Sequence, residues 1–350
     1  MKNKFALTVA ASLSLALVGC GGGGGGSSTS GPVATTPPTT PPAPTPVVLA
    51  PTVQPAVAPT YVSGSQQMSA FNAFTGFRTA LNLPPVNQSV KIDIAAQNHS
   101  DYIAANNGGA TPHDEVAGKP GFTGATVRDR LLTAGYVSGA TGEIIGWTGA
   151  TGDASEAIEG LSATVYHRVL MMNQGWTDLG IAPPVNSDAG RPAYIDFGTS
   201  ATAQNVAGDY IGVYPANGQT AIGLTHAPEA PNPFADVEGT AASFCAKTSF
   251  PISLMSQAST KLAVTTFTVT EEGQTTPIDV RLVTSDSDKS GLLPQYMAFI
   301  VGKVPFKAST KYNVTFKGTA TGAATGAANG VLNINKSWSF TTAAKDYRCK

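Results

Sequence analysis

Apolar residues in the first half of the chain recur at the spacing of an α-helix. They stand three or four positions apart between Ser69 and Leu81, and again between Val90 and Asn106. This periodicity predicts two helices, each with one buried face. Weaker patterns predict two further helices and two strands, over Thr126–Ala134, Asp153–Met172, Glu143–Trp147 and Tyr194–Phe197. Helices and strands mixed without regular alternation favour a layered α+β domain.

The last third of the chain alternates apolar and polar residues, as β-strands do. The alternation is clearest at Tyr312–Phe316. Runs of this kind, about ten residues apart and separated by turn residues, predict an all-β sandwich. The runs are Ile252–Leu254, Lys261–Thr270, Ile278–Val283, Met297–Val301, Tyr312–Lys317, Val331–Ile334 and Trp338–Thr341.

The N-terminus has the features of an export signal. A short basic segment, Met1–Lys4, precedes an apolar stretch, Phe5–Val18, that is too short to span a bilayer. The stretch runs into Leu17-Val18-Gly19-Cys20, which resembles the bacterial lipobox. That resemblance implies a signal peptide over residues 1–19 and a palmitate-type acyl anchor on Cys20 that holds a lipoprotein on the membrane. An ordinary secretory signal with a chance cysteine is the alternative.

The segment between the signal and the first predicted helix has an unusual composition. Residues 5–77 contain no charged side chain, and residues 21–66 consist mostly of Gly, Ser, Thr and Pro. Such a segment cannot bury a core, so we expect a disordered tether. The predicted organisation is a signal peptide (1–19), a lipidated cysteine with a disordered linker (20–66), a first domain (67–200), a connecting segment (201–233) and a β-sandwich (234–350).

Charge excludes several classes of protein. Only 12% of the residues are charged, and the net charge is −1. An ordinary domain has about 25% charged residues. A nucleic-acid partner is therefore not expected, because such partners require a basic surface.

The chain also lacks a G-x-S-x-G nucleophile elbow and an H-E-x-x-H zinc motif, which argues against the common hydrolase classes.

Seven short motifs follow one another in the order found in the CAP superfamily, which comprises cysteine-rich secretory, antigen 5 and pathogenesis-related-1 proteins (SCP domains). They are Phe77-Arg78 with Leu81-Asn82-Leu83, Ala95-Ala96 with His99-Ser100, Pro112-His113, Arg128 with Gly135-Tyr136, Gly142-Glu143-Ile144-Ile145, His167-Arg168, and Asp178-Leu179-Gly180-Ile181. The segment therefore resembles a bacterial CAP domain. The resemblance implies an α+β fold with a three-layer α-β-α sandwich.

The resemblance also implies a central cleft lined by two histidines and usually two glutamates, in which the histidines of several members hold a divalent metal. By motif, these residues are His113, His167 and Glu143. Two imidazoles and a carboxylate suffice for an open zinc site, with water as the fourth ligand. A purely structural role for the two histidines is the alternative.

The second cleft glutamate has no clear counterpart. Glu156 and Glu159 precede His167 on the same predicted helix, about 16 and 12 Å away along the axis, too far to share a metal with it. They remain secondary candidates. His99, on the second predicted helix, is also a secondary candidate, with a hydrogen bond to a backbone carbonyl as the structural alternative.

The β-rich segment resembles the bacterial Ig-like domains that follow CAP domains in envelope proteins. The resemblance rests on Phe250-Pro251-Ile252-Ser253, Leu262-Ala263-Val264, Thr310-Lys311-Tyr312-Asn313-Val314 and Trp338-Ser339-Phe340-Thr341-Thr342. Cys245 and Cys349 bracket it. In an exported protein two such cysteines are expected to form a disulfide.

These patterns lead to one expected function and two alternatives. The first is a bacterial envelope lipoprotein, on the outer membrane if the organism is Gram-negative, whose CAP domain binds a lipid, a glycan or a divalent metal such as Zn. Its Ig-like domain would serve as a spacer or adhesion module. The second is a metal-dependent hydrolase that uses His113, His167 and Glu143. The third is a structural envelope protein with a vestigial cleft. No catalytic residue is assigned, and the enzyme question stays open.

Overall fold

The first half of the fold is built on a four-stranded sheet. The computed structural model describes residues 47–106, 113–148, 152–184, 191–200, 203–327, 329–346 and 349. The strand order is β1–β3–β4–β2, and the strands are Asn87–Gln88, Asp178–Ala182, Pro192–Gly198 and Thr141–Trp147 in that order. Every residue of β4 is buried, because β4 pairs on both sides and is covered on both faces.

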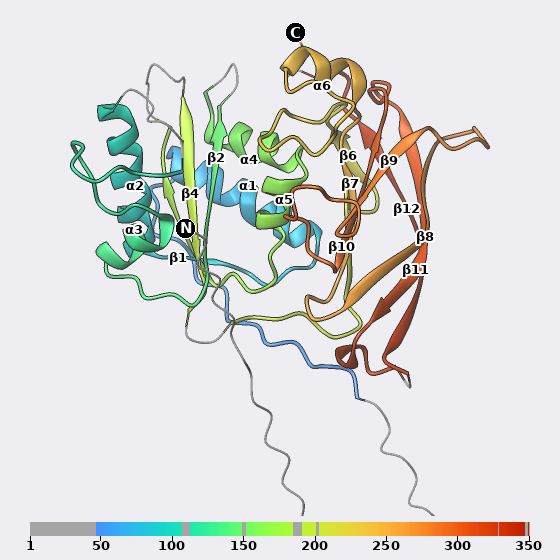
Figure 1. The fold of residues 1–350 in the computed structure, drawn as a ribbon, viewed down its shortest axis with the longest axis horizontal. Coiled ribbons are helices and arrows are strands. Elements are labelled where there is room, and N and C mark those ends of the chain that lie inside the picture. The colour runs from blue at the N-terminus through green and yellow to red at the C-terminus, as the bar shows by residue number, and fades with distance from the viewer. Residues whose placement is uncertain are drawn as a thin grey trace, which may run out of the picture. The chain divides into compact units, whose positions relative to one another are not determined.

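Helices cover both faces of this sheet (Figure 1). On one side lie α2 (Val90–Ala105) and α3 (Val127–Thr133). On the other lie α1 (Gln66–Ala80), α4 (Ala154–Ser162) and α5 (Tyr166–Met171). The predicted α+β fold with three α-β-α layers is confirmed. None of the described helices is long and apolar enough to cross a membrane.

The first helix shows why the sequence pattern succeeded. Ser65 caps α1 by accepting a hydrogen bond from the Met68 backbone N–H at 3.2 Å. Phe71, Phe74 and Phe77 are all buried, as their 3.6-residue spacing predicts. The ring of Phe74 packs against Phe197 of β4 at 5.2 Å between centroids.

The single helix predicted over Asp153–Met172 is wrong, because the chain breaks between α4 and α5. Thr164 turns its hydroxyl back onto the Leu161 carbonyl at 2.6 Å. The next amide, that of Val165, then donates to a side chain from far along the chain, Glu229 Oε1, at 2.7 Å. A long-range carboxylate thus competes for the amides that would continue the helix, and Glu156 and Glu159 do not share a helix with His167.

The second half is an all-β module of two four-stranded sheets. One has the order β5–β7–β10–β9 and the other β6–β12–β11–β8. Their strands are β5 Ile211–Tyr214, β6 Gln219–Ile222, β7 Ile252–Ser256, β8 Lys261–Glu271, β9 Val280–Thr284, β10 Met297–Gly302, β11 Lys311–Thr321 and β12 Val331–Thr342. The last two predicted runs are one strand, β12, because it pairs with β11 without interruption. The segment predicted as a connection, 201–233, supplies β5 and β6.

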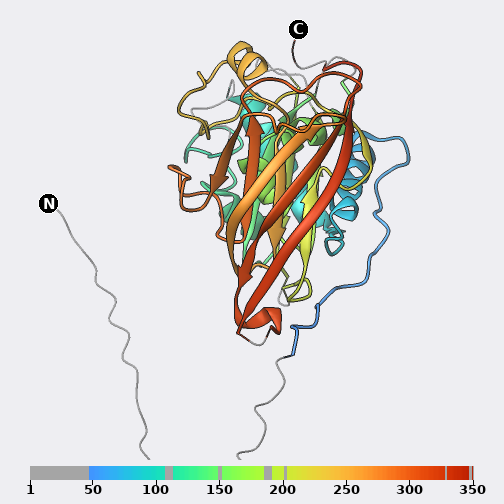
Figure 2. The ribbon, with the colours of Figure 1, turned by 90° about the vertical axis from the view of Figure 1, so that its right-hand side faces the viewer.

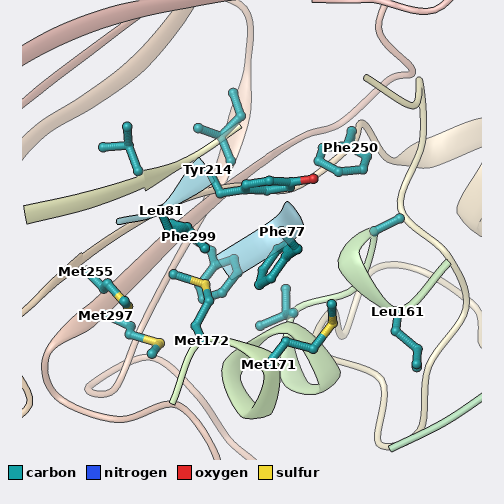
Figure 3. Packing of buried hydrophobic residues seen from close by; sticks show 14 of the residues in the cluster. Phe77, Leu81, Leu161, Met171, Met172, Tyr214, Phe250, Met255, Met297 and Phe299 are labelled. Atoms are coloured by element: carbon teal, nitrogen blue, oxygen red, sulfur yellow. The ribbon is translucent and has the colours of Figure 1, made fainter. Parts of the chain in front are cut away.

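The two halves share a hydrophobic core. Figure 3 shows Phe77 of α1 beside Tyr214 of β5, and their ring centroids are 4.7 Å apart. Arg168 of α5 is fully buried and donates to the Pro251 carbonyl at 2.7 Å. Its guanidinium lies 4.8 Å from the centroid of the Phe250 ring. The all-β module is therefore packed onto the α+β layers as part of one core.

The end of the predicted disordered linker is instead a strap bound to both halves. We call residues 47–61 the strap, seen in blue in Figure 2. Leu49 donates its amide to the Ala324 carbonyl of the β-module at 3.0 Å. Farther along, Val57 donates to the side chain of Asn87 at 2.9 Å. The prediction failed because a Pro-rich segment that cannot build a core can still hydrogen-bond along one.

A disulfide closes the C-terminal part of the chain, as predicted. Cys245, in helix α6 (Ala241–Lys247), is bonded to Cys349, 104 residues later, with 5.7 Å between their Cα atoms. The neighbouring Asp346 carboxylate accepts hydrogen bonds from the amides of Leu224 and Thr225 at 2.9 and 3.0 Å. The C-terminal end is thereby held against the segment between the two halves.

Candidate functional site

His113 lies beside β2, and a buried carboxylate holds its ring. Nδ1 of His113 is 2.7 Å from Oε1 of Glu143. The His113 side chain stays 43% exposed, whereas that of Glu143 is 1% exposed. The two residues border a pocket of about 390 Å³, whose other lining residues are Asp114, Thr126, Val127, Arg128, Thr141, Gly142 and Leu170. The structure thus unites two of the three residues that the sequence placed in the cleft.

Arg130 of α3 fixes both members of this pair. It donates one hydrogen bond to Glu143 Oε2 at 2.8 Å and another to the backbone carbonyl of His113 at 3.0 Å. Burial alone would raise the pKa of Glu143, but the His113 hydrogen bond and the charges of Arg130 and His99 lower it below its ordinary value. Glu143 is therefore a carboxylate at neutral pH, so Nδ1 of His113 carries the proton of the bond.

His99 joins a second carboxylate to this network. Its ring is fully buried, with Nδ1 3.0 Å from Glu115 Oε1 and Nε2 3.8 Å from Glu143 Oε2. Glu115 also accepts the backbone amides of Thr123 and Gly124 at 2.6 and 3.2 Å. His99 is thus part of the site, and both of its ring nitrogens face carboxylates.

Asp196 of β4 lies opposite Glu143 in the strand pairing. It is fully buried, and neither of its carboxyl oxygens has a hydrogen-bond partner among the described residues. Burial and the nearby charge of Glu143 raise the pKa of Asp196 well above its ordinary range. A neutral, protonated Asp196 therefore lies across the strand pair from Glu143, whose carboxylate Arg130 holds.

His167 belongs to a different cluster. Its Nδ1 is 3.2 Å from Oε2 of Glu229, and its side chain is 20% exposed. The other oxygen of Glu229 is 3.2 Å from Nε2 of His226, which is fully buried. Each histidine of the predicted pair, His113 and His167, therefore has a carboxylate of its own.

The two secondary glutamates lie apart from His113. Glu159 lines a separate pocket of about 400 Å³, together with Ser162 of the same helix and Lys345 near the C-terminus. Glu156, in the first turn of α4, has one carboxylate oxygen that is buried and finds no hydrogen-bond partner in the described part of the chain. No contact between either glutamate and His113 or His167 is seen among the described residues.

A metal site does not assemble from these donors. Across the described ranges, no group of three or more His, Cys, Asp or Glu residues is placed to hold a metal ion. Nδ1 of His113 and Nδ1 of His167 each contact a different carboxylate. The residues present therefore do not fit the zinc centre that the resemblance implies. Cys20, the expected lipidation site, lies outside the described residues.

Sequence reasoning missed five residues of these networks: Glu115, Arg130, Asp196, His226 and Glu229. One signal was available, because charged residues are scarce in this chain and Arg130 stands next to a buried leucine on a short helix. Asp196 gave a second signal, as a carboxylate within a strand that is otherwise apolar or aromatic. His226 and Glu229 follow the CAP-like motifs, so no motif pointed to them.

A comparison with protein-family models supports the resemblance. Residues 71–194 match the family model described as "CAP: Cysteine-rich secretory protein family". Among solved structures, the chain is similar to an extracellular protein of Bacillus anthracis containing an SCP domain, with 24% identity and a TM-score of 0.32 over 39% of this chain and 40% of that one. An outer surface protein of Borrelia burgdorferi shows 13% identity and a TM-score of 0.32 over 40% of this chain and 96% of that one. No curated protein matches the chain.

Proposed function

We propose that residues 71–194, which match the CAP family model, form a CAP domain, and that the protein is an exported envelope lipoprotein that binds a glycan at His113. One observation carries the proposal: the His113 ring is fixed by Glu143 at 2.7 Å and still 43% exposed in a pocket. With Nδ1 protonated, Nε2 of His113 is left to accept a hydrogen bond from a ligand.

The lining of the pocket favours a ligand rich in hydroxyl groups. Arg128 and Thr141 are donors, while Asp114 is an acceptor, so both kinds of partner stand around one opening. A polyhydroxyl ligand can use both kinds, whereas an acyl chain can use neither. Of the lipid, glycan and metal ligands considered from the sequence, the glycan class fits these groups best.

Replacing His113 by alanine should weaken glycan binding. We expect saturation-transfer NMR with soluble peptidoglycan fragments to show binding by the wild-type protein and an affinity about tenfold lower for His113→Ala, the effect of one lost hydrogen bond. Glu159→Gln, in the separate pocket, is the matched control and should bind as the wild type does. Equal binding by wild type and His113→Ala would refute the glycan site and favour a vestigial cleft.

A hydrolase is the second candidate, favoured by the same contact. A neutral imidazole whose Nδ1–H is held by a carboxylate is the usual form of a general base, with Nε2 as the proton acceptor. Under this hypothesis Glu143→Gln would bind the fragments but lose turnover. We assign no step of this reaction to a metal ion, since no group of three or more metal-ligating side chains lies together among the described residues.

The location is proposed from the N-terminus. The signal-like segment and the lipobox-like ending at Cys20 support export and lipid attachment, and the disulfide between Cys245 and Cys349 suits an oxidising compartment. The β-module would act as a spacer or adhesion unit of Ig-like type.

Lipid attachment at Cys20 has a direct test. Cells that produce the full chain should incorporate labelled palmitate into the wild-type protein and into Cys245→Ser, but not into Cys20→Ala, because Cys20 alone follows the lipobox-like segment. Label and protein are measured on the same gel. Label in Cys20→Ala at the wild-type level would show that the lipobox interpretation is wrong.

A further inference from the structure

A separate pocket of about 540 Å³ opens between α1, the strap and the segment that precedes β5. It shares no lining residue with the pocket at His113. Part of its wall comes from the strap and from residues 206–210, which lie outside the segment that matches the CAP family model. Most of the lining is apolar and includes Pro51, Val53, Leu83, Pro84, Val86 and Val206. The pocket is therefore distinct from the cleft that the resemblance implies.

Of the described residues that line this pocket, only Arg78 is charged. Its side chain is buried, with 1% exposed. Nε and Nη2 donate to the Pro84 carbonyl at 3.1 and 2.9 Å. Nη1 donates to the carbonyls of Met171 and Asn173 at 3.0 and 2.9 Å. Because a guanidinium has five N–H groups, one N–H of Nη2 is left without an acceptor among the described residues.

No carboxylate in the described part of the chain pairs with Arg78. Its acceptors are backbone carbonyls, and the Phe74 ring 5.9 Å away adds a cation–π contact, but neither carries a net negative charge. Burial lowers the pKa of Arg78 to about 10, and only Tyr210 acts against this shift. Burial raises the pKa of Tyr210, so its hydroxyl is neutral at pH 7. A buried cation without an anion is unfavourable, and this one borders a pocket.

Asn82 adds a second donor to the same pocket. It follows the end of α1 in the left-handed conformation, with φ at 54°, which asparagine adopts more readily than most residues. Its side chain is exposed and makes no hydrogen bond within the described ranges. The amide NH₂ of Asn82 can therefore donate to a ligand that also reaches Arg78.

We propose that this pocket binds a compact organic carboxylate, whose oxygens accept hydrogen bonds from Arg78 and Asn82 and whose apolar body lies against the proline and valine side chains. The bond from a guanidinium to a carboxylate is charge-assisted and stronger than one between neutral groups. An inorganic anion would gain nothing from the apolar walls, whereas an organic carboxylate uses both features of the lining. The inference does not rest on the glycan proposed at His113.

The test compares benzoate with benzamide, which has nearly the same shape and no charge. The full chain is titrated with each compound while NMR follows the ¹⁵N signals of the Arg78 guanidinium. We expect benzoate to shift these signals and to bind at least about tenfold more tightly than benzamide, because only benzoate makes a charge-assisted bond.

A variant at the rim keeps the test independent of the buried arginine, whose removal would also free the carbonyls that it holds. Asn82→Asp replaces the donor by a negative charge at a position that tolerates aspartate. Benzoate should bind this variant about fivefold more weakly or worse, and benzamide should be affected less. Asn313→Asp makes the same change on an exposed position of β11 and should bind benzoate as the wild type does.

Three results would overturn the proposal. The first is equal binding of benzoate and benzamide, which would remove the role of charge. The second is bound benzoate that leaves the Arg78 signals unchanged, since the ligand would then lie elsewhere. The third is displacement of benzoate by sodium chloride at the same concentration, because a site for any anion would not use the apolar walls. Circular dichroism of Asn82→Asp and Asn313→Asp checks that both variants are folded.

Discussion

Arg168→Ala should unfold the whole protein at a markedly lower urea concentration, with a loss of about 3–5 kcal/mol in the free energy of unfolding. The buried guanidinium donates to the Pro251 carbonyl and stacks on Tyr214 and Phe250 at 5.0 and 4.8 Å. Truncation leaves a cavity and unsatisfied buried acceptors in the core that the two halves share. The measurement is urea denaturation followed by tryptophan fluorescence and circular dichroism.

The same experiment tests whether the halves fold together. Because one core spans them, both probes should report a single transition in the wild type and in the variant. Arg128→Ala is the matched control: its side chain is exposed, and the change should cost no more than about 0.5 kcal/mol. Separate transitions for the two halves would contradict the shared core, and so would an Arg168→Ala loss as small as that of the control.

Removing the disulfide should have an effect of similar size. Cys245 and Cys349 close a loop of 104 residues, for which the chain-entropy model gives about 4–5 kcal/mol. We expect the double variant Cys245→Ser/Cys349→Ser to unfold at a lower denaturant concentration than the wild type, and reductant to lower the wild-type midpoint toward that of the variant. Cys20→Ser, which closes no loop, should match the wild type. A double variant as stable as the wild type would contradict the model.

Local patterns predicted the elements whose burial is decided nearby. The spacing of Phe71, Phe74 and Phe77 led to α1 because that helix buries one stripe against one sheet. The alternation at Tyr312–Phe316 led to β11 for the equivalent reason in a strand. Motif order led to the match with the CAP family model over residues 71–194 and to the contact between His113 and Glu143.

Long-range contacts account for what the sequence did not reveal. The break between α4 and α5 depends on Glu229, more than 60 residues away. The strap depends on hydrogen bonds to the two halves rather than on its own composition. The charge network around Glu143 depends on pairing across strands and helices, as with Asp196, and no periodicity in the chain encodes such a pairing.

The strap also sets how far the folded protein can stand from its anchor. If Cys20 carries the lipid, the length of chain between that anchor and the fold is counted to Val47, where the strap begins, and not to Gln66, where α1 begins. At the maximal extension of a polypeptide, the chain from Cys20 to Val47 spans at most about 95 Å, whereas the chain from Cys20 to Gln66 would span about 160 Å. The residues between Val47 and Gln66, which are laid along the fold, thus shorten the protein's maximal reach above the membrane by about two fifths.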